Sequence, residues 1–298
     1  MQLPHLTVSV CTFRRLDMLE RLLKDVATQE THGRFTFSAL VADNDPEGSA
    51  EAVARKCAAA TGLAVAYCKE PRRNIALVRN KLVEESRGDA VVFIDDDEFP
   101  VPGWLAGLYE TWRKHGVAGI LGPVRPHYPD GTPAWLRRGG FFERPEHPTG
   151  FVMPWPECRT GNVLLDRNIF PKNEPAFDPK FPNGGEDVDF YRRMSEAGHK
   201  FVWCNEAVAY ETVPPNRWKR SILLKRALQR GANSSRQPRN RAKNLVKAFV
   251  AAPLYACALP FLQLAGHHLF MRYLVKLCDH SGRLLGWAGL YRPSERQM

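Results

Sequence analysis

Four consecutive carboxylates, Asp95-Asp96-Asp97-Glu98, are the strongest chemical signal in this 298-residue sequence. They follow the apolar run 90–94, which predicts a buried strand. Four adjacent anions repel one another, and a bound cation would relieve that repulsion. Carboxylate oxygens suit Mg²⁺ or Mn²⁺, with substrate phosphates filling the remaining positions. The run therefore predicts a metal and diphosphate site, and an exposed acidic turn is the alternative.

A second acidic pair, Glu186 and Asp187, follows two glycines at the predicted start of a helix over 186–197. Glycine lets a ligand approach the backbone closely. At least one of the two carboxylates can point from the helix start into a cleft, where it could act as a general base toward a hydroxyl group. The alternative is that both acids only stabilise the positive end of the helix dipole.

Five other polar residues are predicted to lie at the same sheet edge or near a helix start: Thr12, Arg14, Asp43, Asn74 and Arg79. Asp43 ends the second predicted strand and could accept from a nucleobase N–H or a ribose hydroxyl, although an Asx turn is an equally good local explanation. Arg79 could bind a diphosphate or a base, or could be an ordinary surface residue.

Strand-like and helix-like segments alternate through the first half of the chain and would position these residues. The predicted strands are 6–13, 35–42, 63–68 and 90–94, and the predicted helices are 16–29, 47–60 and 74–86. Short connections favour a Rossmann-like α/β fold, with a mostly parallel sheet covered by helices on both faces. Such a sheet binds ligands at the carboxyl ends of its strands.

The pattern loosens after about residue 100. We expect helices at 102–115 and 186–197, strands at 117–124, 160–165 and 200–210, and long loops over 128–156. The P-loop, dinucleotide-binding and serine-hydrolase motifs are missing. The seven cysteines form no C-x-x-C pair, which favours a reducing cytosol over a disulfide scaffold or a zinc site.

Taken together, the motifs resemble the family 2 glycosyltransferases of the GT-A fold, and within them the succinoglycan-type, ExoM-like exopolysaccharide glycosyltransferases. The resemblance covers about residues 6–231 and rests on several stretches in the same order. These stretches are CTFRR (11–15), ADND (42–45), NIALVRN (74–80), FIDDDE (93–98), GPVRPHY (122–128), TGNVLL (160–165), FDPKF (177–181), GGEDVDFYRRM (184–194) and ETVPPNRW (211–218).

The resemblance implies a metal-dependent, inverting transfer of a sugar from a UDP-sugar, with Mn²⁺ or Mg²⁺ as cofactor. By position, Asp43 resembles the residue that contacts uracil, with Thr12 and Arg79 beside the nucleotide. Asp95 resembles the first acid of the D-x-D motif and faces ribose, and Asp97 resembles the metal ligand that holds the donor diphosphate.

The resemblance also assigns the catalytic and acceptor side. Asp187 resembles the general base, and Glu186 lies beside it. The stretch Thr160-Gly161-Asn162 matches a segment usually near the sugar and the acceptor. We place Arg14, Asn74 and Asp96 with the nucleotide, and Asp95 also with the metal.

Two departures from the family pattern bear on mechanism. Arg217-Trp218 matches the end of the Q-x-x-R-W motif of processive synthases, but Pro214 stands in the position of Gln, which points to a non-processive enzyme. Where many relatives carry a further metal-binding His, the nearest residues here are Tyr210 and Glu211. The role of Arg217 and the complete metal shell are therefore open.

Charge is distributed unevenly: the net charge of +10 combines −4 over residues 1–211 with +14 over residues 212–298. The basic part is followed by 248–271, which contains no Asp, Glu, Lys or Arg. We expect a catalytic domain over 1–212, with a nucleotide half to about 100 and an acceptor half over 101–212. A basic and apolar helical extension would cover 213–298.

The extension predicts an anionic membrane surface as partner. Together with the resemblance to the exopolysaccharide subgroup, it implies a lipid-linked saccharide acceptor at the cytoplasmic face of the inner or plasma membrane. Segment 248–271 could be peripheral, re-entrant or a single span, and core helices are the alternative. Two other functions stay open, a sugar-1-phosphate nucleotidyltransferase and a non-catalytic protein that binds nucleic acid or membrane. We expect no nucleic-acid partner, because no recognition helix or interleaved aromatic strand is evident.

Overall fold

A computed structural model describes residues 2–182, 184–235 and 241–291, and the chain divides into two compact units. The first unit comprises residues 1–125 and 144–211, and the second comprises 126–143 and 212–298. Residues 126–143 thus belong to the second unit, whereas the sequence analysis places them in the acceptor half of the catalytic domain.

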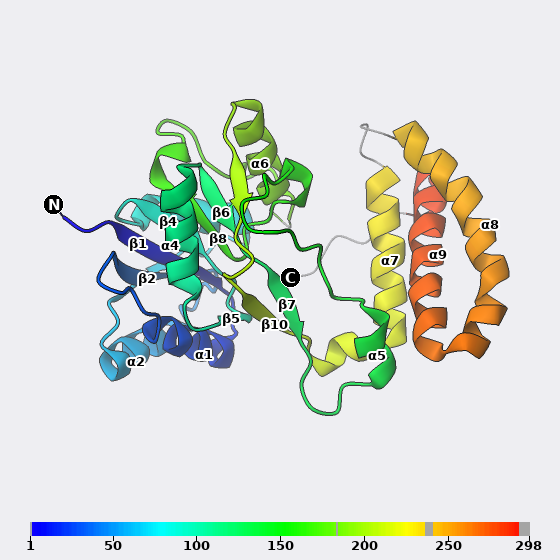
Figure 1. Ribbon diagram of the computed structural model, residues 1–298, viewed down its shortest axis with the longest axis horizontal. Helices are drawn as coiled ribbons and strands as arrows, with labels where there is room; N and C mark the ends of the chain where they lie inside the picture. Colours follow the sequence, from blue (N-terminus) through cyan, green and yellow to red (C-terminus); the bar gives the residue numbers. More distant parts are fainter. Residues whose placement is uncertain (1, 183, 236–240, 292–298) are drawn as a thin grey trace. The chain divides into compact units, whose positions relative to one another are not determined.

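The first unit is built on a seven-stranded sheet with the order β3-β2-β1-β4-β8-β6-β9 (Figure 1). Strand β8 runs antiparallel to both of its neighbours, and the other pairs are parallel. This confirms the predicted α/β fold with a mostly parallel sheet. The strands are β1 (His5–Thr12), β2 (Thr36–Asp43), β3 (Val65–Lys69), β4 (Ala90–Phe93), β6 (Gly119–Leu121), β8 (Val163–Asp166) and β9 (Phe201–Trp203).

Helices cover both faces of this sheet because alternate strand residues are apolar on opposite sides. In β4, Ala90 and Val92 face one core and Val91 and Phe93 face the other. The first core is closed by α1 (Leu16–Ala27), α2 (Glu51–Thr61) and α4 (Trp104–His115), and the second by α3 (Ile75–Glu85) and α6 (Glu186–Glu196). Two short 3₁₀ helices, Trp155–Glu157 and Arg167–Ile169, flank β8 in the chain.

A second sheet accounts for two strands that the sequence analysis did not separate. Segment 117–124 forms β6 and the start of β7 (Val124–His127), and 200–210 forms β9 and the start of β10 (Ala209–Thr212). Pro123 cannot donate to a ladder, so the first segment changes sheet there. With β5 (Glu98–Pro100), these strands form a three-stranded sheet in the order β5-β10-β7.

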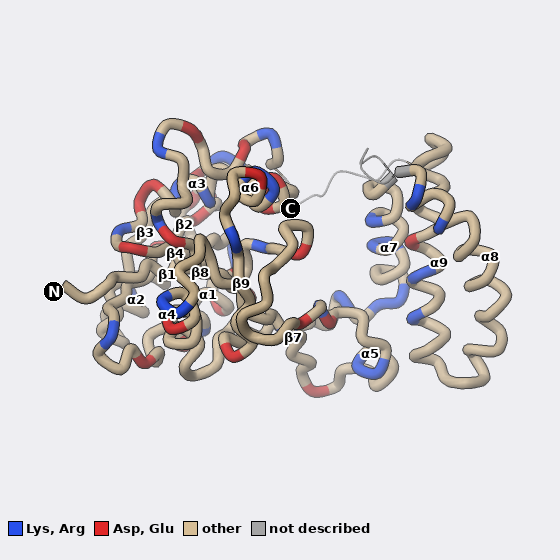
Figure 2. Tube along the Cα trace, turned by 45° about the horizontal axis from the view of Figure 1, so that its top comes forward, with Lys and Arg blue, Asp and Glu red and all other residues tan. Residues whose placement is uncertain are grey.

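The second unit is helical. It contains α5 (Ala134–Gly139), which falls where only loops are predicted, a 3₁₀ helix (Pro215–Trp218), α7 (Arg220–Ser235), α8 (Arg241–Ala265) and α9 (His267–Trp287). Leu136, Val213 and Leu223 form its small core together with aromatic side chains. In Figure 2, acidic positions are spread over the first unit, whereas the charged positions on α7 and α9 are mostly Lys and Arg, and most of α8 is uncharged.

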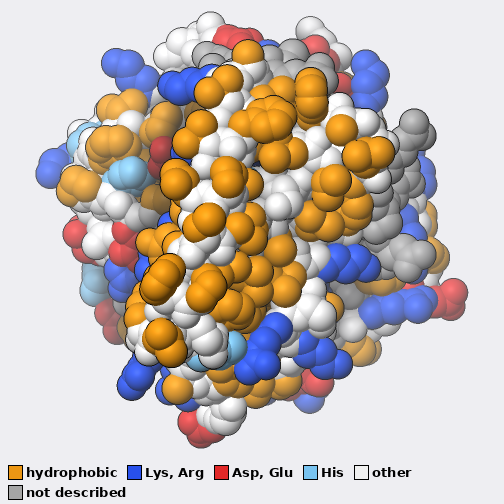
Figure 3. Space-filling model, turned by 90° about the vertical axis from the view of Figure 1, so that its right-hand side faces the viewer, with side chains coloured by type: hydrophobic (Ala, Val, Ile, Leu, Met, Phe, Trp, Pro, Cys, Tyr) orange, Lys and Arg blue, Asp and Glu red, His pale blue; other side chains and the backbone are white. Residues whose placement is uncertain are grey.

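The apolar segment 248–271 is divided between two helices, and whether it is peripheral, re-entrant or spanning stays a prediction. Helix α8 ends at Ala265, Gly266 adopts a φ of 142°, and α9 begins at His267. A backbone conformation that favours glycine therefore breaks the run. One helix, Ala242–Ala265, is long and apolar enough to cross a bilayer, and hydrophobic side chains cover its outward side (Figure 3).

Candidate active site

The acidic run lies where the order of the strands reverses. The chain places β2 and β3 on one side of β1 and then crosses over to place β4 on the other side. Open α/β sheets bind ligands at the carboxyl ends of strands beside such a crossover. Thr12 is the last residue of β1, and Asp95 to Asp97 follow the end of β4. These predicted site residues therefore share one edge of the sheet.

Asp96 connects the ends of β1 and β4. Its carboxylate accepts from Thr12 Oγ1 at 2.8 Å and from Arg15 Nη1 at 2.9 Å, and the residue is 4% exposed. Burial raises the pKa of Asp96 to about 6 despite the nearby Arg15 guanidinium. Asp96 is thus buried at this edge of the sheet by its contacts with Thr12 and Arg15. Its role in nucleotide binding stays a prediction.

Asp95 and Asp97 are more accessible than Asp96. The Asp95 side chain is 47% exposed, and Asp97 accepts from Arg15 Nη1 at 3.0 Å. A Cβ atom on Gly161 would lie 3.1 Å from Asp95 Oδ2 and 2.9 Å from Glu98 Oε1. The missing side chain at Gly161 therefore leaves room for these two carboxylates.

Arg79 joins the two acidic groups that the sequence shows as separate motifs. Its Nη1 donates to Glu186 Oε1, and its Nη2 lies 4.0 Å from Asp95 Oδ1. Both Arg79 and Glu186 are buried, and burial raises the pKa of Glu186. The other oxygen, Glu186 Oε2, is buried without a hydrogen-bond partner among the described residues. Asp187 uses Oδ1 to accept from the N–H of Val188 at 2.7 Å.

Asp43 is fully buried and bonded within its own loop. Its carboxylate accepts from the backbone N–H groups of Asp45 and Ala50, both at 2.8 Å, and from the Tyr67 hydroxyl at 3.1 Å. Arg14 has a φ of 54° and donates to both oxygens of Asp45 at 3.0 Å, which lowers the pKa of Asp45 to about 2. The contact of Asp43 with uracil stays a prediction.

Asn162 holds segments of the chain together. Its Nδ2 donates to the carbonyl oxygens of Pro123 and Ala207, both at 2.8 Å, and its Oδ1 accepts from Trp104 Nε1 at 2.7 Å. The residue is fully buried and has a φ of 52°. Its side chain thus shapes the backbone beside Gly161, and a direct sugar contact stays a prediction.

The four remaining predicted residues are dispersed. Asn74 caps α3 through its side chain, and Thr160 Oγ1 is buried without a partner among the described residues. Arg217 and Trp218 belong to the second unit, where Trp218 Nε1 donates to the carbonyl of Val213 at 2.9 Å. The described contacts of Trp218 are thus with the core of its own unit.

Four more residues contribute charges to this region: Arg15, Glu98, Arg144 and Glu211. The sequence analysis assigned no role to Arg15 or Arg144, whereas it placed Glu98 in the carboxylate run and Glu211 near the position of a further metal ligand. Glu98 lies opposite Glu211 in the β5–β10 ladder, and Arg144 donates to Glu211 Oε2 at 2.7 Å. Burial raises the pKa of Glu98 well above its usual range, and the Asp95 charge adds to the rise. Glu98 and Glu211 stand in quoted motifs, whereas Arg144 lies in a loop-like region that carries no motif.

The carboxylates of this edge fit a hard divalent cation. Their donors are all oxygen, and Mg²⁺ or Mn²⁺ is commonly bound by one or two carboxylates while substrate phosphates complete the shell. Among the described residues, no three His, Cys, Asp or Glu side chains converge to hold an ion. The assignment of Asp95 and Asp97 as metal ligands stays a prediction.

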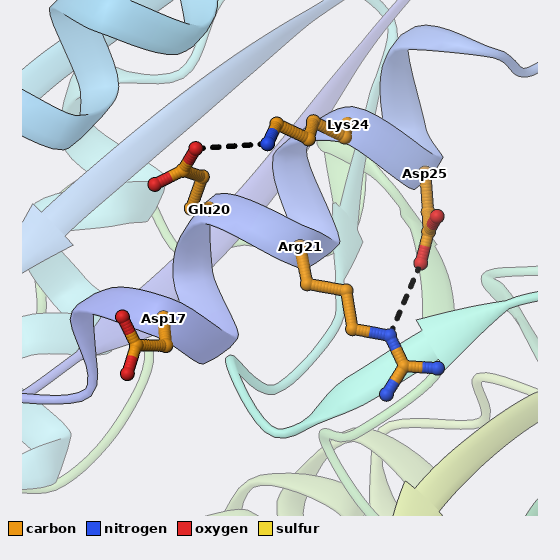
Figure 4. A pocket seen from close by; sticks show the side chains of 5 residues that line it. All are labelled: Asp17, Glu20, Arg21, Lys24 and Asp25. Atoms are coloured by element: carbon orange, nitrogen blue, oxygen red, sulfur yellow. Dashed lines mark hydrogen bonds and ion pairs between the residues drawn. The ribbon is translucent and has the colours of Figure 1, made fainter.

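A hollow on α1 is separate from these residues. Asp17, Glu20, Arg21, Lys24 and Asp25 line it, and all belong to α1 (Figure 4). Glu20 pairs with Lys24 at 2.8 Å and Arg21 lies 3.9 Å from Asp25, both at i,i+4 spacing. Such pairs are typical of a solvated helix surface.

The sequence compares closely with known glycosyltransferases. The family profile "Glycosyl transferase family 2" matches residues 7–170. The succinoglycan biosynthesis protein ExoM of Rhizobium meliloti is 36% identical over 249 residues, which cover 82% of this chain and 79% of that protein. The glycosyltransferase AglE of Haloferax volcanii is 24% identical over 217 residues, or 72% of this chain and 68% of that protein.

Solved structures share the fold at low identity. The mannosyltransferase PcManGT from Pyrobaculum calidifontis, in complex with GDP-Man and Mn²⁺, has a TM-score of 0.64 and 17% identity, covering 97% of this chain and 88% of that one. S. aureus TarS 1-349 in complex with UDP-GlcNAc has a TM-score of 0.54 and 14% identity, with 97% and 91% covered.

Proposed function

The chain belongs to glycosyltransferase family 2, and from that premise we propose that it transfers a sugar from a UDP-sugar to a hydroxyl of a lipid-linked saccharide. The product would enter an exopolysaccharide or another cell-surface glycan. The similarity to a succinoglycan biosynthesis protein supports the class of product. The basic and apolar second unit supports a lipid-borne acceptor.

The contact of Arg79 with both acidic groups carries this proposal. Donor phosphates would bind near Asp95 and Asp97, and the acceptor hydroxyl would have to reach Asp187. Arg79 lies between these groups, because it pairs with Glu186 and approaches Asp95. Its position supports one site in which the leaving group and the attacking oxygen meet.

On the donor side, the chain would orient a diphosphate and balance its charge. Asp95 and Asp97 would hold Mn²⁺ or Mg²⁺, which when bound neutralises the negative charge that builds on the leaving diphosphate. Arg15 lies against Asp96 and Asp97, and its guanidinium is within reach of phosphate oxygens that approach this edge. Gly161 lets the backbone approach the Asp95 and Glu98 carboxylates closely, which supports a place for Asp95 at this edge.

On the acceptor side, we assign the general base to Asp187. Asp187 Oδ1 bonds the N–H of Val188, and Oδ2 has no partner among the described residues. Oδ2 could remove the proton from the acceptor hydroxyl as that oxygen forms the new bond to the anomeric carbon. Attack from the face opposite the leaving diphosphate is a single displacement and inverts the anomeric configuration.

A screen of nucleotide sugars tests the proposal. The full chain, with Mn²⁺ or Mg²⁺ and a lipid extract as acceptor, is expected to release UDP from one UDP-sugar and to add that sugar to a lipid. The Asp187→Asn variant serves as control for contaminating activity. Release of pyrophosphate from UTP and a sugar-1-phosphate, supplied in a parallel reaction, would instead identify a nucleotidyltransferase. No release with any donor in the presence of the extract would contradict the proposed transfer.

A further inference from the structure

We propose that α8 lies in the plane of an anionic bilayer, with its outer face below the headgroups. The outer face is defined as Val246, Phe249, Val250, Leu254, Phe261 and Leu264. The inference deepens the proposed function by naming the surface that would bring the enzyme to a lipid-borne acceptor. It selects one of the membrane arrangements that the sequence leaves open.

The outer face is a continuous apolar stripe. Its members are between 56% and 88% exposed and recur at three- and four-residue intervals, which places them on one side of a helix. Cys257 and Pro260, also exposed, lie on the same side. From 248 to 265 the helix has no charged residue. Water would hydrate this stripe unfavourably, so a covering partner is expected.

The other side of α8 already has a partner within the second unit. Tyr255 packs against Tyr273 of α9 with ring centroids 5.5 Å apart, and Ala248 is fully buried. Helix α9 in turn packs tightly on α7. A Cβ atom on Gly231 of α7 would lie only 1.9 Å from the carbonyl oxygen of Asp279 on α9, so the two backbones meet where glycine has no side chain. Helices α7 and α9 therefore form a base that presents the outer face of α8.

Charge identifies an anionic lipid surface as the occupant. Residues 212–298 hold 16 Lys and Arg and two acidic residues. Of those two acids, Asp279 pairs with Arg230 and Arg283, and Glu295 lies outside the described residues. Figure 3 shows Lys and Arg side chains at the margins of the apolar band. Basic side chains beside an apolar stripe match headgroups above acyl chains.

The basic side chains of α9 favour an in-plane helix over a span. From 246 to 264 the stripe is about 27 Å long, enough to cross the hydrocarbon core. Lys276, however, is exposed on α9 and its Nζ lies 6.0 Å from the ring centre of Tyr255, halfway along α8. A span would carry this charge toward the bilayer centre, which is costly. If α8 lies flat, only its outer face enters the bilayer, and Lys276 on α9 stays outside it.

Cys257 allows a direct measurement of depth. All seven cysteines lie in the described residues as free thiols, and Cys257 is the one classed as exposed. A nitroxide attached to Cys257 of the full chain is mixed with vesicles of phosphatidylcholine and phosphatidylglycerol, without any donor. We expect a depth about 5–10 Å below the headgroup boundary. A label at Leu264→Cys in a Cys257→Ser chain should lie at a similar depth, because both residues are on the outer face. Depths that differ by about 10 Å, as expected for seven residues along a spanning helix, would overturn the in-plane arrangement.

Two further outcomes would also overturn the proposal. One is a label that remains in water when vesicles are added. The other is a label already protected without vesicles, which would indicate a second copy of the chain on the outer face. Cys11, Cys68 and Cys278 are partly exposed, so the variant Cys257→Ser, treated in the same way, gives the signal of labels at those positions. The difference between the two chains assigns the depth to Cys257.

A paired substitution tests the face itself. Leu254→Glu with Phe261→Glu places two charges on exposed positions and is expected to weaken vesicle binding at least about tenfold. Leu3→Glu, at a residue 45% exposed in the first unit, is the matched control and should bind like the unmodified chain. Circular dichroism verifies folding. Unchanged vesicle binding of the paired variant would contradict the proposal. Because the binding measurement uses no sugar donor, it stays valid even if the protein fails to transfer a sugar.

Discussion

Arg79 on α3 and Glu186 in the first turn of α6 form a buried ion pair across 107 residues of sequence. The pair fixes the start of α6, and with it Asp187, relative to the acidic run after β4. Since each charge is withdrawn from water, each depends on the other for its stability. The pair is therefore expected to support both the fold and the alignment of the two acidic groups.

Removing one partner should destabilise the protein. Arg79→Leu leaves the Glu186 carboxylate buried without its counter-charge, and we expect a loss of about 3–5 kcal/mol in the free energy of unfolding. Urea unfolding measures this loss. Adding Glu186→Leu to the same chain should restore most of it while transfer stays impaired. A double variant no more stable than Arg79→Leu alone would show that the pair does not act as a unit.

Asp187→Asn tests the general base. The amide cannot take up the proton from the acceptor, so turnover should fall by about 10²–10⁴-fold while donor affinity is kept. UDP release and calorimetry with the donor measure the two quantities. Asp189→Asn is the control, because Asp189 lies in the same helical turn but bonds to Arg192 and Arg193. Near-normal turnover of Asp187→Asn would exclude this assignment.

Asp97→Ala should weaken metal-dependent donor binding. Loss of one of two carboxylate ligands is expected to lower the affinity for UDP with Mn²⁺ about tenfold or more, with less effect on UDP alone. Calorimetry with and without Mn²⁺ separates the two cases. Glu110→Ala removes the same charge from an exposed position on α4 and serves as control. An unchanged affinity for UDP with Mn²⁺ would rule out Asp97 as a ligand.

The buried Asp96 should make stability depend on pH. Its pKa is raised from 3.8 to about 6, so the folded chain keeps a proton that the unfolded chain releases above about pH 4. The group therefore favours folding below about pH 4, and this contribution, at most about 3 kcal/mol, is lost as the pH rises through about 6.

Asp96→Asn removes this titration. The unmodified chain should lose stability relative to the variant between about pH 4 and 7 in urea unfolding. Asp130→Asn, at an exposed acid, should leave the pH profile unchanged. A stability difference between Asp96→Asn and the unmodified chain that does not vary with pH would contradict the expectation.

Asn162→Ala should act on stability more than on substrate affinity. It removes three buried hydrogen bonds, those of the Asn162 side chain with Trp104 Nε1 and with the carbonyl oxygens of Pro123 and Ala207. We expect the free energy of unfolding to fall by about 3 kcal/mol or more. Thermal unfolding measures this loss, with the exposed Asn168→Ala as control. A normal unfolding temperature combined with a raised donor KM would instead indicate a direct sugar contact.

Much of the fold could be predicted because apolar periodicity and short connections are local properties of the chain. The alternating residues of β1, the apolar run of β4 and the helices between them identify the parallel half of the sheet. A strand was predicted at 160–165, but its antiparallel direction as β8 and the switch from β6 to β7 were not, because they depend on which strands are neighbours in space. The short helix α5 was not predicted either, since its segment is rich in Pro, Gly and aromatic residues.

The sequence by itself determined the residue types of the site: the carboxylates after an apolar strand, the Glu186-Asp187 pair, and the basic, apolar C-terminal part. Only the tertiary structure decided their different environments. Asp96 turns into the sheet edge while Asp95 stays accessible, and Arg79 reaches Glu186 rather than solvent. The physical reason is that burial and pairing depend on residues distant in the chain, such as Thr12 and Gly161. The accessible apolar face of α8 likewise follows from the packing of its other side on α9.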